Sequence, residues 1–220
     1  CLRLGNDEVE ILLTTDVGPR AIRAGYVGED NLFYEVPDQA GLTGGDDFRL
    51  YGGHRLWHAP EVKPRTYDPE NRPIEVDERD GALLLRPAKE ERTGIRKEWD
   101  VSMVEGQNRF VVVHRLVNEG VWDVDLAPWC LSVMGQKGRA IVPHEEYRPH
   151  TEYLLPARPL VLWHYTDMSD PRFTWGRRYL QLRQDPDREQ PQKVGLLNTR
   201  GWAAYERAGT VFLKTYPVWP

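Results

Sequence analysis

Apolar and polar residues alternate with a period of two along most of the chain, in short runs that end at glycine, proline, asparagine or aspartate. This alternation is typical of β-strands with one buried face, and no run keeps the 3.6-residue period of an amphipathic helix. The pattern therefore predicts an all-β protein with few, short helices. The predicted strands are residues 9–15, 21–26, 32–35, 74–79, 82–86, 95–104, 109–118, 124–134, 179–183, 194–198, 202–206 and 211–215.

The connections between these runs indicate antiparallel pairing. Asp80-Gly81 lies between two of them and is a strong hairpin signal, and residues 106–108 and 119–120 join the next pairs. Residues 143–175 contain five prolines and are predicted to form long loops, where ligand contacts tend to lie. A chain of 220 residues can bury one core, so we expect a single β-sandwich domain over residues 1–220. The chain stops at YPVWP, so either the domain ends there or its last strands are missing.

The charge distribution narrows the class of partner. There are 29 basic and 34 acidic side chains, and the basic ones are spread along the chain. This argues against a nucleic-acid or membrane partner, and no run of 18 apolar residues predicts a membrane span. Cys1 is interpreted as a truncated start rather than the first residue of a lipoprotein, because no flexible tether follows it. The expected compartment is the cytoplasm.

The chain is rich in aromatic residues, with eight tryptophans and ten tyrosines, many of them in segments rich in proline and glycine. Packing in a β-sandwich accounts for part of this content. Aromatic faces outside the core are surfaces on which sugar rings stack. The composition therefore favours a small-molecule carbohydrate as the partner.

The densest candidate chemistry is the run YGGHRLWHAPE, residues 51–61. As a helix it would place His54 and His58 one turn apart, where they could hold a zinc ion. The two glycines before His54 and the proline at position 60 instead favour an extended segment. Its histidines and Arg55 with Trp57 would then lie on opposite faces. We therefore predict no metal.

These side chains have two interpretations. Trp57 and the histidines are either core residues, with the imidazoles satisfied by the backbone, or parts of a polar site. We favour the site, with His54, His58 and Glu61 as acid and base groups and Arg55 and Trp57 as substrate contacts. No nucleotide-binding, GxSxG or CxxC motif is present, and no cofactor is predicted.

Two further residues are candidate substrate contacts. Lys97 points away from its strand neighbours, either to a solvated edge or into a site. His114 ends a strongly apolar run and is either a core histidine or a partner of a site residue.

The segments TTDVGPRAIRAGYVGEDNLFYE, YGGHRLWHAPE, TGIRKEW, HRLVNEG, LAPWCLSVM and KVGLLNTRGWAAY together resemble a group of galactose-mutarotase-like proteins. The resemblance implies an antiparallel β-supersandwich with a carbohydrate site on its concave face. It places His54 and Arg55 near the family's sugar contacts, and Trp129 where aldose 1-epimerases carry their catalytic histidine. The late glutamate that serves those enzymes as base has no recognisable counterpart before Pro220.

The resemblance implies a carbohydrate-recognising protein. It is either an atypical aldose 1-epimerase-like enzyme, which acts at the anomeric centre by acid and base catalysis, or a non-catalytic sugar-binding module of the same fold. In both versions Trp129 would supply an apolar ring face rather than a proton.

Overall fold

The computed structural model describes residues 1–218, and the chain divides into two compact units, Cys1–Met134 and Gly135–Pro220, where the sequence pattern suggested one domain. Within the described residues there is no helix of seven or more residues, and the strands pair antiparallel. The prediction of an all-β fold is confirmed. The expectation that the domain either ends at the YPVWP segment or lacks its last strands concerns, in part, residues 219–220, which lie outside the described residues. The described residues contain no helix that could span a membrane.

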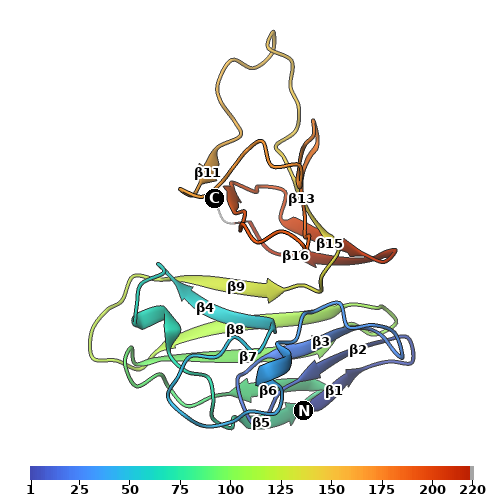
Figure 1. The fold of residues 1–220 in the computed structure, drawn as a ribbon. Coiled ribbons are helices and arrows are strands. Elements are labelled where there is room, and N and C mark those ends of the chain that lie inside the picture. Colours follow the sequence, from blue (N-terminus) through green and yellow to red (C-terminus); the bar gives the residue numbers. More distant parts are fainter. Residues whose placement is uncertain (219–220) are drawn as a thin grey trace. The chain divides into compact units, whose positions relative to one another are not determined.

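The first unit contains two antiparallel sheets (Figure 1). The five-stranded sheet has the order β1 (Leu2–Gly5), β2 (Val9–Leu13), β3 (Ala21–Tyr26), β4 (Gly53–Ala59) and β9 (Ala127–Val133). The four-stranded sheet is a meander of β5 (Glu75–Arg79), β6 (Ala82–Arg86), β7 (Ile95–Met103) and β8 (Phe110–Asn118). Two 3₁₀ turns lie in the connections, η1 (Pro37–Gln39) and η2 (Arg65–Tyr67).

The hairpin predicted at Asp80-Gly81 is confirmed. Both residues have positive φ, 51° and 74°, as a two-residue type I′ turn requires, and Arg79 pairs with Ala82. The run at residues 32–35 forms only isolated bridges rather than a strand. Its short length and the following proline leave no room for a continuous ladder.

The core of the first unit lies between its sheets. Along β7, Ile95, Trp99 and Val101 are buried on one face, and Trp99 contacts His54 of β4 across the two sheets. Lys97 lies in the same buried row. The predicted alternation is therefore present, and it places a lysine on the apolar face of β7.

The second unit is built around β10 (Arg139–Pro143), which lies between β13 (Tyr179–Arg183) and β15 (Trp202–Arg207). The sheet is completed by β12 (Phe173–Trp175) and β16 (Thr210–Thr215), and β11 (Leu160–Leu162) pairs with β14 (Val194–Leu196). Most of residues 143–175 is irregular, as predicted, and β11 and β12 are the two short strands in it. β1, β10, β11 and β12 were not among the predicted strands.

Candidate functional site

The central run is an extended strand, as predicted, and the glycines before it are the reason. Gly52 has φ 105°, and a Cβ there would lie 2.0 Å from the carbonyl oxygen of Tyr34. A Cβ on Gly53 would lie 2.2 Å from the carbonyl oxygen of Ala21. Only glycine allows this close approach of two backbones, so the two glycines let the start of β4 pack against the neighbouring segments.

The pleat of β4 separates the candidate residues into two groups. His54 lies opposite Ser132 and His58 opposite Pro128 in the register with β9, and Arg55 and Trp57 point to the other face. His54 and His58 are therefore four positions apart on an extended strand. The helix that would have placed them one turn apart, where they could hold a zinc ion, does not form. Among residues 1–218, no group of three His, Cys, Asp or Glu side chains is placed to hold a metal ion.

His54 lies in the interior between the two sheets. Its Nδ1 is 2.8 Å from Ser132 Oγ, its Nε2 is 3.0 Å from His114 Nε2, and its ring contacts Trp99. The structure therefore brings together His54 and His114, two of the predicted site residues. Both ring nitrogens of His54 have a side-chain partner on the inner faces of the sheets.

His58 is paired with a carboxylate that the sequence did not indicate. Its Nε2 lies 2.9 Å from Glu90 Oε2, and both side chains are buried. The predicted partner, Glu61, is instead exposed and accepts a hydrogen bond from the hydroxyl of Tyr67. The structure thus gives His58 a carboxylate partner, but from the connection between β6 and β7.

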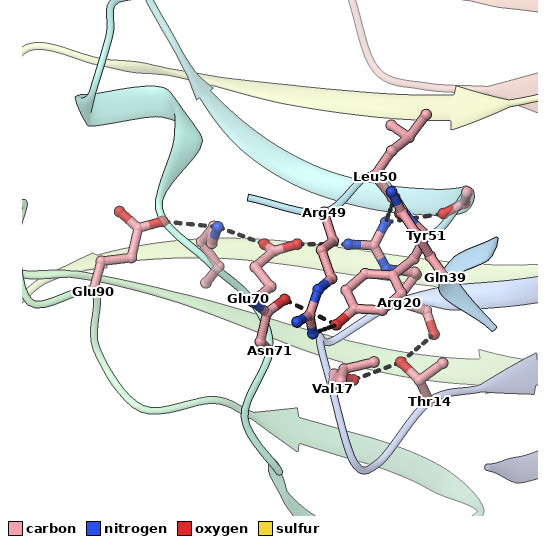
Figure 2. A network of polar contacts seen from close by, with 12 residues as sticks. Thr14, Val17, Arg20, Gln39, Arg49, Leu50, Tyr51, Glu70, Asn71 and Glu90 are labelled. Carbon is pink, nitrogen blue, oxygen red and sulfur yellow. Dashed lines mark hydrogen bonds and ion pairs between the residues drawn. The ribbon is translucent and has the colours of Figure 1, made fainter. Parts of the chain in front are cut away.

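The pair belongs to a larger charge network of His58, Glu90, Lys97, Glu70 and Arg20. Lys97 Nζ lies 2.7 Å from Glu90 Oε1 and 2.5 Å from Glu70 Oε1. Arg20 Nη2 lies 2.9 Å from the other oxygen of Glu70. Figure 2 shows Glu70 between Arg20 on one side and the contacts that lead to Glu90 on the other. The five side chains come from five separate segments, so the network ties together connections that are distant in sequence.

Burial and pairing fix the charges of this network. Burial alone would raise the pKa of Glu90, but hydrogen bonds from His58, Lys97 and Thr93 and the charge of Lys97 lower it to about 2. Burial would lower the pKa of Lys97, but Glu70 and Glu90 outweigh it and raise that pKa. Glu90 and Lys97 are therefore both ionised near neutral pH.

The network opens to solvent at a cleft of about 380 Å³. Glu70, Glu90 and Lys97 line its floor, and its rim carries further charged side chains. Burial, followed by the charge of Glu90, raises the pKa of the Asp68 carboxyl in this rim. The remaining charged lining residues are Asp46, Arg72, Lys89, Glu91 and Arg92. Acidic and basic groups nearly balance in the lining, five against four.

The other face of β4 carries an aromatic cluster around a buried arginine. The guanidinium carbon of Arg55 lies 3.9 Å from the ring centroid of Trp57 and 5.1 Å from that of Phe48. Trp57 also contacts Trp129, directly opposite on β9, in a T-shaped arrangement with centroids 5.3 Å apart. Trp129 therefore lies on the face of the sheet away from His54, and does not line a pocket beside that histidine.

Three residues of the charge network were missed in the sequence. Arg20 follows a glycine and a proline, and Glu70 and Glu90 lie in connections rich in charge and proline, where a carboxylate is usually solvated. The one available signal was Lys97, a cation on the buried face of a strand, which requires a carboxylate partner.

Comparison of the chain with protein-family models, with curated proteins and with solved structures gave no match. The resemblance to galactose-mutarotase-like proteins stays a prediction.

Proposed function

We propose that the protein recognises a carbohydrate in the cleft above the charge network. The observation that carries this proposal is that Glu70, Glu90 and Lys97 line the cleft and are already held in place by one another. A sugar hydroxyl both donates and accepts, so it can donate to a carboxylate and accept from the ammonium group. Groups held in advance lose little freedom when a ligand binds.

The charge balance of the lining favours a neutral ligand. Five acidic and four basic side chains give no strong net field, so an anion or a cation gains little over an uncharged molecule. A ligand with many hydroxyl groups uses both kinds of partner. This matches a neutral sugar better than a phosphorylated or amino sugar.

The ionisation states favour binding without turnover. An acid or base catalyst works best with a pKa near the working pH, whereas the pKa of Glu90 is about 2 and that of Lys97 is raised. The aldose 1-epimerase-like version is the second candidate, and the pair of His58 and Glu90 favours it, because an imidazole behind a cleft carboxylate can exchange a proton with it.

Asp68→Asn is expected to weaken sugar binding at least tenfold, because a hydrogen bond to a charged group contributes about 1.5–3 kcal/mol. Asp68 lines the cleft, and burial and the charge of Glu90 disfavour its own charge, so removing that charge should not destabilise the fold. Calorimetric titration with D-glucose, D-galactose, D-mannose and D-xylose measures the effect. The control is Asp38→Asn, on an exposed residue of η1. Equal affinities in the two variants, or no binding of any of the four sugars, would refute the proposal.

Polarimetry separates the binding module from the enzyme. The wild-type protein is expected to leave the mutarotation rate of freshly dissolved D-glucose or D-galactose at the rate in buffer, because neither Glu90 nor Lys97 is poised to move a proton. A faster rotation change that is lost in both His58→Gln and Glu90→Gln would establish the epimerase-like function instead. Circular dichroism of the variants checks that they fold.

A further inference from the structure

A second hollow lies beside the polar cleft in the first unit. It has a volume of about 400 Å³ and is lined by Pro64, Arg65, Arg92, Thr93, Ile95 and Val124. Each hollow has the size of a small ligand site, at the lower end of the range of about 300–1,000 Å³ for such sites.

The turn from Glu90 to Gly94 contributes lining residues to both hollows. Arg92 lines both of them. Thr93 lines the second hollow, and its hydroxyl donates to Glu90 Oε2, which belongs to the network under the first. Backbone hydrogen bonds from Glu90 to Ile95 and from Gly94 to Glu90 hold the turn closed. A ligand that extends from the polar cleft into the second hollow therefore passes over this turn, a ridge that carries Arg92.

The second hollow differs in chemistry from the first. Pro64 and Val124 present apolar surface above the buried Ile95, and Arg65 and Arg92 also line the hollow. Arg65 is held by a contact of 3.5 Å with the carbonyl oxygen of Asp125, in the same connection as Val124. A sugar ring has an apolar face of C–H groups and a polar edge of hydroxyls, and a lining of this composition suits both.

We propose that the ligand is an oligosaccharide of at least two sugar units, with one unit in the polar cleft and the next in the second hollow. This inference rests on the proposed function and extends it to the substrate class. The two units would be joined over the ridge, where Arg92 can donate hydrogen bonds to either. The polar cleft supplies hydroxyl recognition, and the second hollow supplies apolar contact.

The test compares monosaccharides with disaccharides by calorimetric titration of the whole chain. D-glucose is compared with maltose and cellobiose, and D-galactose with lactose. At least one disaccharide is expected to bind tenfold or more tightly than its monosaccharide. Val124→Asp is expected to remove this gain and leave monosaccharide affinity within twofold, since it puts a charge into the second hollow alone. Arg65→Gln is expected to reduce the gain as well.

Val121→Asp is the matched control, because Val121 lies in the same connection, is 90% exposed and does not line the hollow. It should keep the full gain. Monosaccharide binding with no gain for any of the disaccharides, or a gain that survives both Val124→Asp and Arg65→Gln, would overturn the inference and leave the proposed function standing. If neither monosaccharides nor disaccharides bind, the proposed function itself is wrong.

Discussion

Replacing Lys97 by methionine is expected to lower the free energy of unfolding by about 3–5 kcal/mol, although methionine fits the apolar row of β7 better than lysine does. The variant leaves Glu70 and Glu90 buried without the cation that lies within 2.7 Å of both. An uncompensated buried charge costs more than the apolar contact gains. Urea unfolding at pH 7, followed by tryptophan fluorescence, measures the loss, because Trp99 is fully buried two residues away.

Two further variants show whether the loss comes from the charge. Lys89→Met removes an exposed lysine of the cleft rim and should change stability by less than about 0.5 kcal/mol. Lys97→Met combined with Glu90→Gln should be more stable than Lys97→Met alone, because one orphaned charge is removed. A single Lys97→Met variant as stable as the wild type would mean that the ion pairs of Lys97 contribute nothing to folding.

The second large effect is on acid stability. The pKa of Glu90 is about 2 in the folded chain and close to its ordinary value of 4.5 after unfolding. Because the pKa of Glu90 is lower in the folded chain than in the unfolded chain, its ionised carboxylate stabilises the fold at pH values above about 4.5. This contribution to the free energy of unfolding is lost as the pH falls from about 4.5 to about 2. With about 1.4 kcal/mol for each pH unit, Glu90 contributes roughly 3 kcal/mol at neutral pH.

Glu90→Gln isolates this contribution. The difference in unfolding free energy between wild type and Glu90→Gln should be largest above pH 5 and should shrink by roughly 3 kcal/mol at pH 2. Glu91→Gln changes the neighbouring residue, whose side chain is 77% exposed and pairs with Arg72 at the surface. Its difference from wild type should stay small at every pH, and a pH-independent difference for Glu90→Gln would exclude the network as the source of acid sensitivity.

The sequence was sufficient for most of the strands, because their alternation is a local property, but it missed β1, β10, β11 and β12. The extended form of β4 followed from two glycines and a proline, and the turn at Asp80-Gly81 followed from its two residues alone. Division of the chain into two units was not foreseen, since no change of composition marks the boundary after Met134.

The site was only half predictable, because burial of a charge depends on distant segments. His58 and Lys97 stood out as candidates, but their partner Glu90 lies 32 positions from His58 in a connection that looks solvated. Nearness in sequence suggested Glu61 instead, and that carboxylate bonds Tyr67 at the surface. The partner of His58 is set by a contact between segments that are distant in sequence, and no local sequence pattern indicates that contact.

One feature of the network limits how the cleft can be redesigned. The two glutamates of its floor come from separate connections, one carrying Glu70 and the other Glu90, and the ammonium group of Lys97 joins them. A graft that replaces either connection must therefore keep its carboxylate, because without it the link through Lys97 to the other connection is lost. Positions 68, 72, 89 and 91 face the same cleft without contacting Lys97. Substitutions at these four positions can therefore change ligand preference, while Glu70 and Glu90 keep their ion pairs with Lys97.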